Sequence, residues 1–548
     1  MREFEIQDCG GRKVSEILGE KGLDGTLIAA VDNTLRELNY RLPDDDRHAI
    51  RPLDCTDREG AKIYEASLRY LVGMASERAL PDLRVHISYG ISKSILLTFT
   101  DRKTGAKVKA TEEIRDKLES EMKELVAKDL PITKRTVRKE EALELYEKLK
   151  AQDRIEALSY RPESTVHLYS CDGYVDYPYS YMVTSTGKLG EFRLVCTESG
   201  ILMSYPRSED GGKIPELEKD ISFANALKRN RDWAERAGLV SIADINRVYK
   251  EYGAVDLIGM CEAYCSEQYL KLAELYMTKA KTCRLIFISG PSSSSKTTFA
   301  KRLKTLLMAY GLRPIRISMD DYYRDRNTLV PGPDGKIDLE SIDALDLDRF
   351  NSDMLSLSKG LTTEVPAYDF KVNHRVKGRT LTPRDNSPII VEGIHGLNPK
   401  VTDNLPRDVW MGIYISPQVQ VCIDDHNPMS LTDARLIRRI VRDHWSRNTS
   451  SEETILAWAD VRRGEYQNIY PYQDNADFVF NSYLSYEMCV LKKHALPLLS
   501  YVSSTSPAYV TANRLIKFLK YFPSIPDEVV PCNSLIREFI GGSSYENE

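Results

Sequence analysis

Hydrophobic and polar residues alternate in different ways in successive parts of this chain. Near the N-terminus, Phe4 and Ile6 are separated by a polar residue, a spacing that predicts a half-buried strand. The stretch LIAAVDNTLREL then predicts two strands around a turn at Asp32-Asn33. A polar stretch that contains proline, RLPDDDRHAIRPLD, follows it. We therefore expect a small β-rich domain over residues 1–55.

Residues 56–220 combine helical and strand patterns, which predicts an α+β domain. Apolar residues recur at helical spacing in GAKIYEASLRYLVGMA and EEIRDKLESEMKELVAK, while VHISYGI, SILLTFT and FRLVCT are typical of strands. Residues 221–283 are mostly helical and predict a connector. Cys261 and Cys265 lie four residues apart on one face of this connector, but no His joins them. Two thiols alone make a poor metal site, so we expect them to be buried small side chains.

The pattern changes at Arg284. RLIFISG predicts a buried strand, a Gly/Ser-rich turn follows, and FAKRLKTLLMAYG predicts a helix. Strands and helices alternate in this way to about residue 500, which indicates an α/β domain with a parallel sheet and helices on both faces. A tail over residues 501–548 carries one more helical pattern, TANRLIKFLKYF. The predicted fold class is multidomain, α/β and α+β, with the α/β domain over residues 284–500.

Composition narrows the range of functions. The 548 residues include 76 Lys and Arg against 81 Asp and Glu, a net charge of −5 that excludes a globally basic nucleic-acid coat but not a local basic face. No stretch approaches the roughly 20 apolar residues that span a bilayer, and the start, MREFEIQDCGG, has no apolar signal-peptide core. The 10 cysteines are scattered without a C-x-x-C pair, as is typical of free thiols in a reducing cytosol. We expect a cytoplasmic protein without membrane contact.

A phosphate-binding loop is indicated by GPSSSSKTT at Gly290–Thr298, because this stretch follows a predicted strand and opens a predicted helix. In the pattern G-x-x-x-x-G-K-[ST], Gly290, Lys296 and Thr297 match, but Ser295 stands where glycine is usual. Backbone N–H groups of such a loop point at phosphate oxygens, the lysine reaches the β- and γ-phosphates, and the threonine hydroxyl holds Mg²⁺. The alternative is a serine-rich turn that only caps a helix. Ser295 costs about 1 kcal/mol or more relative to glycine only if its φ is positive.

Acidic and arginine side chains elsewhere are suited to complete such a site. RPIRISMDDYYRD brings Asp320 and Asp321, and PIIVEGIHGL brings Glu392, to the C-terminal ends of predicted strands, where the sites of α/β proteins gather. In DARLIRRIVRDHWSRN, at ~100° per residue, four arginines fall within a ~100° arc: Arg435, Arg438, Arg439 and Arg442. Guanidinium groups bind phosphate bidentately, so this arc favours anionic oxygens. The alternative is a solvated basic face, although exposed faces usually mix Glu with Lys.

Together these segments resemble the uridine–cytidine kinase family, with phosphoribulokinase as a more distant relative. The matching pieces are the loop at Gly290–Thr298, MDDYY, PAYDF…R, IVEGI and RLIRRIVRD, in the family's order over about 284–495. The resemblance implies an ATP-dependent kinase in which Asp320 takes the proton of a nucleoside 5′-hydroxyl while arginines cover the phosphates. In the family, a His follows the Tyr of Y-D-F by five places and contacts the pyrimidine edge. Here Asn373 has that place and His374 comes one residue later.

The loop pattern and the resemblance together define the expected site. The expected catalytic residues are Asp320, Lys296, Arg439 and Arg442. The expected ATP contacts are Gly290, Ser292, Ser293, Ser294, Ser295, Lys296, Thr297, Thr298 and Arg447. The expected nucleoside contacts are Tyr323, Glu340, Tyr368, Asn373, His374, Arg375 and Arg435. The expected Mg²⁺ ligands are Thr297, Asp320 and Glu392.

The N-terminal half resembles threonyl-tRNA synthetases. TLIAAVDNTLREL is similar to their β-grasp TGS domain, and residues 56–205 are similar to their editing domain, most clearly at VDYPYSYMVTSTG. That editing domain uses H-x-x-x-H and C-x-x-x-H pairs, and the four positions here are Ala66, Tyr70, Pro178 and Met182. None of the four can replace a metal ligand or an acid–base group, so we expect no editing chemistry. The fusion, with its ending NSLIREFIGGS, is typical of a bacterial group of nucleoside-kinase-like proteins.

The sequence therefore predicts a kinase that uses ATP and Mg²⁺ to phosphorylate a nucleoside 5′-hydroxyl, with uridine or cytidine as first candidates. Another small hydroxylated acceptor is an open alternative, because only the contacts from Tyr368–Arg375 and Glu340 would differ. A nucleotide-gated RNA-binding regulatory protein is a further alternative, with RNA contact through the N-terminal domains. Residues 1–220 have no basic stripe with interleaved aromatics, which argues against it. We also expect a homo-oligomer.

Overall fold

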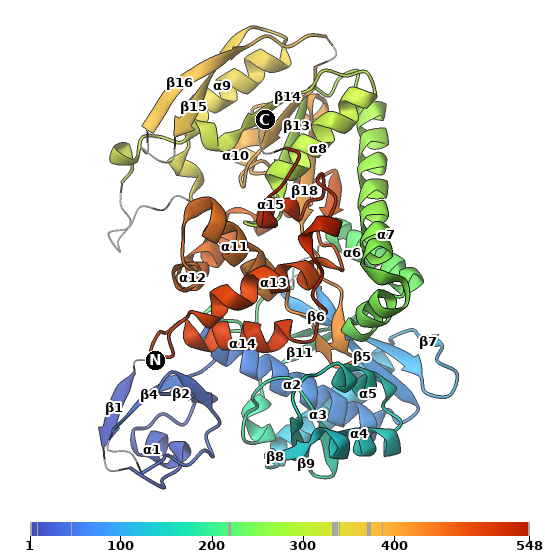
Figure 1. Ribbon diagram of the computed structural model, residues 1–548, viewed down its shortest axis with the longest axis vertical. Coiled ribbons are helices and arrows are strands. Elements are labelled where there is room, and N and C mark those ends of the chain that lie inside the picture. Colours follow the sequence, from blue (N-terminus) through green and yellow to red (C-terminus); the bar gives the residue numbers. More distant parts are fainter. Residues whose placement is uncertain are drawn as a thin grey trace.

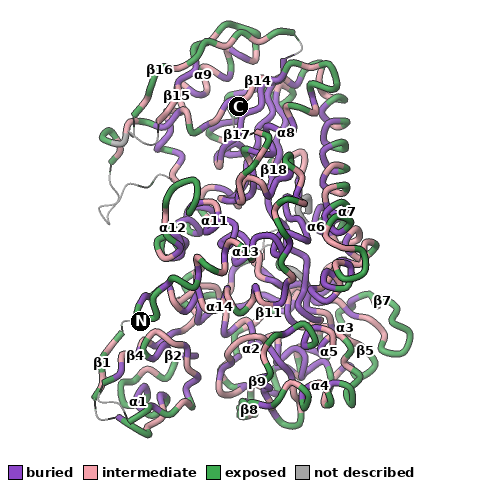
Figure 2. Tube along the Cα trace, viewed as in Figure 1, coloured by how far each residue is buried: buried purple, intermediate pink, exposed green. Residues whose placement is uncertain are grey.

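The computed structural model describes residues 3–7, 9–44, 47–91, 93–217, 221–330, 338, 340–369, 374–385 and 387–545. The chain forms an elongated body, with the N-terminal sheets at one end and a parallel sheet at the other (Figure 1). Buried residues, purple in Figure 2, fill the parallel sheet and continue into the region between the two ends. The N-terminal and C-terminal halves of the chain are therefore packed against one another as well as linked by the chain.

The first unit is a small antiparallel sheet with one helix. It comprises β1 (Phe4–Gln7), α1 (Val14–Glu20), β2 (Ile28–Val31), β3 (Thr34–Arg36) and β4 (Arg47–Leu53), with the strand order β1-β4-β2-β3. The predicted turn between β2 and β3 is present: Asp32 and Asn33 have φ of 49° and 57°, as a type I′ hairpin turn requires. In β1, Phe4 and Ile6 are half-buried between exposed neighbours, as their alternation predicted.

The second unit is α+β and contains two antiparallel sheets. Its elements are α2 (Arg58–Ala79), β5 (Leu83–Ile91), β6 (Ser94–Asp101), β7 (Lys107–Val108), α3 (Glu112–Ala127), β8 (Thr133–Arg138), α4 (Lys139–Lys148), α5 (Gln152–Ser159), β9 (Thr165–Cys171), β10 (Tyr174–Asp176), β11 (Arg193–Thr197) and β12 (Gly200–Ser204). One sheet has the order β11-β12-β6-β5, with β7 paired to β6, and the other has the order β10-β9-β8. Asp57 caps the N-terminus of helix α2, because its carboxylate accepts hydrogen bonds from the N–H groups of Glu59 and Gly60.

Two helices connect this unit to the parallel sheet, namely α6 (Ile221–Ala237) and α7 (Ile242–Lys279). Helix α7 breaks at Gly253, whose φ of 86° and ψ of 178° are not helical. Cys261 and Cys265 of α7 are buried in the main core, and burial raises the pKa of each thiol to about 12. No helix among the described residues has both the length and the apolar character needed to cross a membrane.

The C-terminal half is built on a five-stranded parallel sheet, which confirms the predicted α/β class. Its strands are β13 (Leu285–Ser289), β14 (Ile315–Ser318), β17 (Ile389–Glu392), β18 (Trp410–Ser416) and β21 (Phe478–Asn481), in the order β14-β17-β13-β18-β21. All residues of β13 are buried because both faces of the sheet are covered. Ile286 and Ile288 pack in one cluster with the apolar residues of α8 and α11, while Leu285 and Phe287 pack in another with those of α9.

The remaining elements surround this sheet. They are α8 (Lys296–Ala309), α9 (Leu347–Ser358), the hairpin β15–β16 (Thr363–Asp369 and His374–Leu381), α10 (Pro399–Thr402), the hairpin β19–β20 (Cys422–Asp424 and Asn427–Pro428), α11 (Leu431–Arg447), α12 (Ser451–Asn468), α13 (Glu487–Ser500), α14 (Tyr509–Leu519) and α15 (Arg537–Ile540). The last two helices pack back onto the α/β half, α14 against α13 and α15 against α11. The C-terminal tail is thus part of the same packed body (Figure 1).

A cluster of charged residues joins α2, α11 and α14. Asp433, in the first turn of α11, lies 2.8 Å from the Nζ of Lys62 and 3.3 Å from the Nη2 of Arg58. Arg514 bridges two carboxylates, because its Nε is 3.1 Å from Glu59 Oε2 and its Nη1 contacts Asp433. Although burial alone would raise it, the surrounding cations lower the pKa of Glu59 to about 2. The N-terminal half is therefore held to α11 by compensated, partly buried charges.

Arg514→Ala is expected to destabilise this joint by roughly 2 kcal/mol, less than the 3–5 kcal/mol typical of breaking a fully buried pair. The expected loss of stability is smaller than for a fully buried pair because Arg514 is 25% exposed and because Lys62 still compensates the charge of Asp433. Thermal unfolding of the full chain measures the effect. Arg463→Ala is the control, since its partner Asp460 and Arg463 itself are 51% and 61% exposed; it should change stability by no more than about 1 kcal/mol. Equal melting of both variants would contradict a stabilising role for the joint.

Candidate active site

The segment Gly290–Thr298 forms a loop between β13 and the first turn of α8, as the sequence pattern predicted. Glycine is required at its start, because a Cβ on Gly290 would lie 2.0 Å from the carbonyl oxygen of Ile415. The side chain of Lys296 folds back over the loop, and its Nζ donates to the carbonyl oxygens of Gly290 and Pro291 at 2.9 and 3.0 Å. The lysine is thus held at the mouth of the loop, where a phosphate group would meet its charge.

The serines of the loop show two unusual features. Ser295 has φ 69° and ψ 32°, and Ser293 has φ 60°, both in the left-handed region that favours glycine. The condition under which Ser295 costs about 1 kcal/mol relative to glycine is therefore met. The hydroxyls of Ser293, Ser294 and Ser295 are buried and have no hydrogen-bond partner among the described residues. Three unpaired hydroxyls beside the loop N–H groups are suited to phosphate oxygens.

Ser292 is held on both sides by buried charges. Its N–H donates to Glu465 Oε1 at 3.1 Å, and its carbonyl oxygen accepts from Arg435 Nη2 at 2.8 Å and from Nε at 3.1 Å. Arg435 and Glu465 are both fully buried, and the Nη1 of Arg435 lies 2.9 Å from Glu465 Oε2. Arg462 also contacts Glu465, at 2.6 Å. Although burial opposes ionisation, these two arginines hold the pKa of Glu465 below its usual value.

Arg438 makes a second brace of the same kind. It is fully buried, its Nε donates to Glu487 Oε1 at 2.9 Å, and its Nη1 donates to the carbonyl oxygen of Ser293 at 3.2 Å. This corrects two expectations from the sequence. Arg435 was predicted to contact the nucleoside, and the four-arginine arc was predicted to face anionic oxygens or solvent. Instead, Arg435 and Arg438 are inside the protein and bind the backbone of the loop.

The other arginines of α11 lie closer to solvent and share one carboxylate. Arg439 Nε is 3.1 Å, Arg442 Nη2 is 2.7 Å and Arg447 Nε is 3.6 Å from the carboxylate of Asp443, which is nearly fully buried. Arg439 also donates from Nη1 to the hydroxyl of Ser292 at 3.0 Å. Burial lowers the pKa of Arg439 and of Arg447, with the nearby arginines adding to the shift. The three guanidinium groups form a positive cluster that exceeds the charge of its single carboxylate.

The carboxylates at the strand ends differ in what they face. Asp320 keeps part of its surface exposed, but the protein packed around its carboxyl raises the pKa by desolvation, and the charges of Lys296 and Arg447 oppose that shift. Burial raises the pKa of Asp321 as well, but the cations that oppose it there include Arg379. Asp320 therefore lies on the side of the loop lysine, and Asp321 on the side of the β15–β16 hairpin.

Thr297, Asp320 and Glu392 provide hard oxygen ligands of the kind Mg²⁺ prefers. Thr297 donates from Oγ1 to Glu392 Oε1 at 3.3 Å. Burial, followed by the charge of Asp320, raises the pKa of Glu392 to about 7, and a cation would relieve that repulsion. Across the described residues no group of three or more His, Cys, Asp or Glu side chains could hold a metal alone. Mg²⁺ usually binds one or two carboxylates and takes its other ligands from water and phosphate, so these residues fit it.

The expected acceptor residues gather only in part. The rings of Tyr323 and Tyr368 lie 5.8 Å apart at 53°, and burial raises the pKa of Glu340, with Glu465 adding to the shift and Arg439, Lys296 and Asp320 close enough to act on it. Arg375 instead binds the backbone oxygen of Tyr323 at 3.0 Å and Asp346 at 2.9 Å. His374 is exposed, with Nδ1 3.6 Å from Asp325 Oδ1. Asn373 lies outside the described residues.

Several residues of this region were missed by the sequence reasoning. Glu465 binds the loop, and Asp443 binds the arginine cluster. In the sequence, only Asp443 had a usable signal, because it lies four residues after Arg439 and four before Arg447. His395 is 2% exposed, burial lowers its pKa to about 4, and neither ring nitrogen has a hydrogen-bond partner among the described residues. A polar residue within the apolar stretch IIVEGIHGL was its signal.

The four positions that correspond to editing residues lie in the other half of the chain. Ala66 and Met182 are buried in the core of the second unit, and Tyr70 donates from its hydroxyl to the backbone oxygen of Tyr174 at 3.1 Å. Pro178 also lies in this unit. The side chains that are present serve packing and, at Tyr70, hydrogen bonding to the backbone oxygens of Tyr169 and Tyr174.

The parallel sheet and the strand–loop–helix at its centre define an α/β phosphate-loop protein. Residues 285–487 match the phosphoribulokinase/uridine kinase family. The uridine kinase of Staphylococcus carnosus is 30% identical over 196 residues, which are 36% of this chain and 85% of that enzyme. The uridine kinase of Macrococcus caseolyticus is 31% identical over 196 residues, 86% of its length. Through this segment the chain belongs to the phosphoribulokinase/uridine kinase family.

The N-terminal part is similar to a different enzyme. The threonine–tRNA ligase of Aquifex aeolicus is 27% identical over 194 residues, which are 35% of this chain. The chain spans only 30% of the length of that ligase. Among solved structures, D-glycerate 3-kinase from Cryptococcus neoformans is 15% identical, with a TM-score of 0.27 over 40% of this chain and 90% of that one. The chain is thus a fusion of a family segment with a part similar to threonine–tRNA ligase.

Ser295→Gly is expected to raise the free energy of unfolding by about 1 kcal/mol, because glycine has no steric penalty at a φ of 69°. ATP affinity, measured by calorimetry, should stay the same or increase. Ser294→Gly is the matched control for the free energy of unfolding, since the φ of Ser294 is not positive and glycine there relieves no strain. A loss of ATP affinity beyond about tenfold in Ser295→Gly would show that this hydroxyl is itself a ligand.

Proposed function

We propose that this protein is an ATP-dependent kinase that transfers a phosphoryl group to the 5′-hydroxyl of a nucleoside, with uridine and cytidine as first candidates. The observation that carries the proposal is the set of groups around one loop: Lys296 at its mouth, Thr297 at its end, and Asp320 and Glu392 from neighbouring strand ends. The membership of residues 285–487 in the phosphoribulokinase/uridine kinase family supports it. The uridine kinases that match this segment suggest the acceptor.

Catalysis in this proposal is positioning combined with electrostatic stabilisation. The loop N–H groups bind the phosphates, and Lys296 releases the two carbonyl oxygens to meet the β- and γ-phosphates. Arg439, Arg442 and Arg447 stabilise the negative charge of the transferring group. Asp320 accepts the proton of the acceptor hydroxyl, and its raised pKa suits that task. Thr297, Asp320 and Glu392 would hold Mg²⁺, which would supply positive charge against the negative charge of the phosphate groups.

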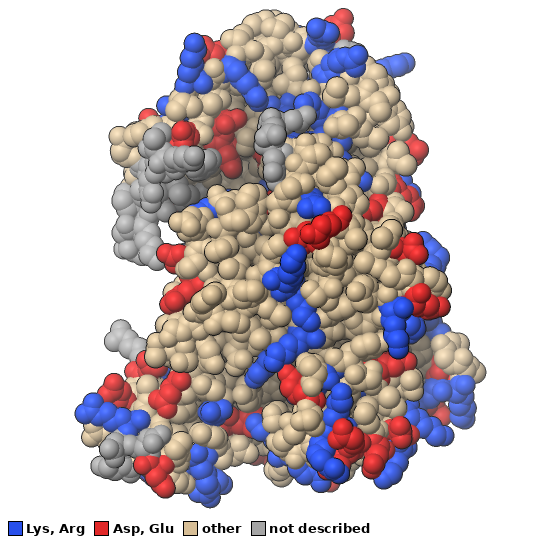
Figure 3. All heavy atoms as spheres, in the orientation of Figure 1, with Lys and Arg blue, Asp and Glu red and all other residues tan. Residues whose placement is uncertain are grey.

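The proposal also divides the chain by role. Residues 284–500 carry catalysis, with the connector at 221–283 and the tail at 501–548 packed around them. The TGS-like unit at 1–55 and the editing-like unit at 56–220 have no catalytic role of their own. An RNA-binding regulatory role has less support, because Lys and Arg are interspersed with Asp and Glu on the face shown in Figure 3. RNA binding depends mainly on gathered positive charge.

A different hydroxylated acceptor is the second candidate, and one observation favours it. The segment that contacts the pyrimidine edge in the family carries an exposed His374 that pairs with Asp325, and Arg375 is engaged with backbone and with Asp346. The base-contacting groups here are therefore arranged differently from the family's pattern. The phosphate-binding groups would serve either acceptor equally.

A panel of acceptors tests the proposal directly. The full chain with ATP and Mg²⁺ is assayed for ATP consumption with the four ribonucleosides, free ribose and small hydroxylated acids. We expect turnover with uridine or cytidine and formation of the 5′-monophosphate. Lys296→Ala should remove turnover and leave the melting curve unchanged. Turnover only with a non-nucleoside acceptor favours the second candidate, whereas salt-dependent RNA retention without turnover contradicts a kinase.

Asp320→Asn should lower kcat by at least about a hundredfold, the usual scale for loss of a general base. Nucleoside affinity should change far less, because the ribose and base are held by other residues. Asp321→Asn is the matched control and should be mild, since that carboxylate lies on the Arg379 side. Steady-state rates and calorimetry on both variants decide between them. If Asp321→Asn is the more severe, the assigned base is wrong by one residue.

A further inference from the structure

A carboxylate from the end of the chain lies at the phosphate loop. Glu538, in the short helix α15, accepts a hydrogen bond from the backbone N–H of Thr298, with Oε2 and N 3.2 Å apart. Thr298 is in the first turn of α8, where N–H groups have no partner within the helix and the helix dipole is positive. These are the donors that cradle nucleotide phosphates in loops of this type. Glu538 therefore occupies a place that the α- or β-phosphate of ATP would take.

The charges around Glu538 are those expected around a phosphate group. Burial lowers the pKa of Lys296 and of Arg447, and Glu538 is among the carboxylates that oppose both shifts. Glu538 also adds to the raised pKa of Glu392, after burial and Asp320. It thus lies within electrostatic reach of the loop lysine, an arginine of the cluster and the proposed metal ligand.

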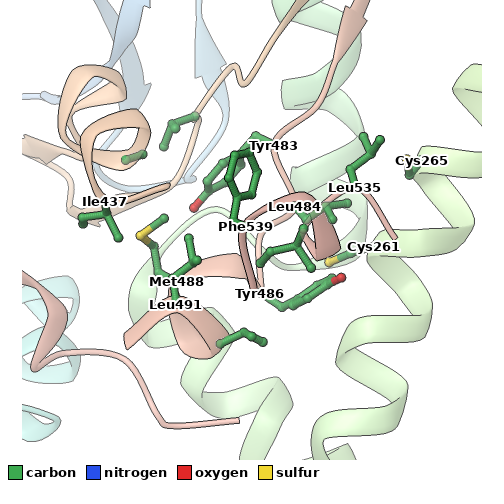
Figure 4. Close-up of a cluster of buried hydrophobic side chains, with 14 of the residues drawn as sticks. Cys261, Cys265, Ile437, Tyr483, Leu484, Tyr486, Met488, Leu491, Leu535 and Phe539 are labelled. Atoms are coloured by element: carbon green, nitrogen blue, oxygen red, sulfur yellow. The ribbon is translucent and has the colours of Figure 1, made fainter. Parts of the chain in front are cut away.

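Apolar contacts fix the backbone beside this carboxylate. Leu535, Ile536 and Phe539 are fully buried in the main core. Figure 4 shows Phe539 and Leu535 among the side chains that follow β21, including Leu484 and Tyr486. The ring of Phe539 lies 5.0 Å from the guanidinium of Arg438, the arginine that braces the loop. The segment is therefore anchored by its neighbours, while Glu538 itself is only half-buried.

Two hydrogen bonds attach the C-terminal segment around Glu538 to helices α11 and α8. Trp445 of α11 donates from Nε1 to the backbone oxygen of Phe539, and Lys301 of α8 donates to the backbone oxygen of Tyr545. Between them, Gly541 and Gly542 have φ of 79° and 70°, which allows the chain to turn back along α8. The C-terminal segment thus covers the first turns of α8, next to the loop.

We propose that Glu538 is an intramolecular substitute for a nucleotide phosphate, which competes with ATP for the N–H groups of the loop. This inference rests on the proposed function, because it requires that the loop bind ATP. A carboxylate and a phosphate carry like charge and cannot share one donor at 3 Å without strong repulsion, so ATP must displace the Glu538 side chain. Because Phe539 anchors the backbone, the carboxylate of Glu538 can leave the loop only by rotation of its side chain or by a shift of the short helix α15. The apparent association constant for ATP is then the intrinsic constant multiplied by the fraction of molecules in which Glu538 has left the loop.

Glu538→Gln tests the competition, because it keeps the shape of the side chain and removes its charge. ATP affinity of the full chain is measured by calorimetry without any nucleoside. We expect binding about tenfold tighter than wild type, the scale of a lost charge-assisted hydrogen bond. Glu528→Gln is the matched control, since Glu528 is exposed on the same tail and its substitution removes the same charge. It should bind ATP like wild type.

A second measurement separates competition from a structural role. Without ATP, Glu538→Gln should melt at or below the wild-type temperature, and the rise in melting temperature caused by ATP should be larger than in wild type. A purely structural contact would lower stability without changing the ATP-induced rise. Wild-type ATP affinity in Glu538→Gln, or weaker binding, would overturn the inference and leave the proposed function intact. If neither wild type nor variant binds ATP, both the proposed function and the inference are wrong.

Discussion

Burial of two arginines beneath the phosphate loop is the constraint on which the rest of the site depends. Removing a guanidinium from water costs several kcal/mol, and only close pairing and complete hydrogen bonding offset that cost. Glu465 and Glu487 provide the pairing, and the carbonyl oxygens of Ser292 and Ser293 accept further N–H groups of Arg435 and Arg438. The loop backbone is therefore part of a buried ionic network. This explains how serines hold left-handed conformations where glycine would be free of strain.

The same helix extends this network to the N-terminal half. Asp433 lies two residues before Arg435 on α11, and it is held by Lys62 from α2 and Arg514 from α14. Movement of α2 relative to α11 would have to break these pairs or carry the bracing arginines with it. The part similar to threonine–tRNA ligase is thus in direct mechanical contact with the helix that supports the phosphate loop. A stabilising role for that part requires no chemistry of its own.

Charge balance around the loop explains why several carboxylates lie close to the proposed site for anions. Lys296 and the cluster of Arg439, Arg442 and Arg447 create a strong positive field at the loop. Without a nucleotide, this field is offset by carboxylates of the protein, among them Asp443 and Glu538. Burial raises the pKa of Glu392 to about 7, and the negative charge of Asp320 adds to that shift. In the function proposed above, phosphate groups and a cation would replace these side-chain charges.

Local order along the chain was enough to predict the antiparallel N-terminal strands, the strand–loop–helix at 285–309 and the parallel α/β half, because each depends on spacing within a few residues. Helical angles placed Arg435 and Arg438 on one face of α11. They could not show whether that face meets solvent or protein, because burial is decided by the partners. Glu465 lies 30 residues from Arg435, and Glu487 lies 49 residues from Arg438. The contact of Thr298 with Glu538 spans 240 residues. Such contacts have no periodic signal, since loops of any length can close them, and only the tertiary structure determines them.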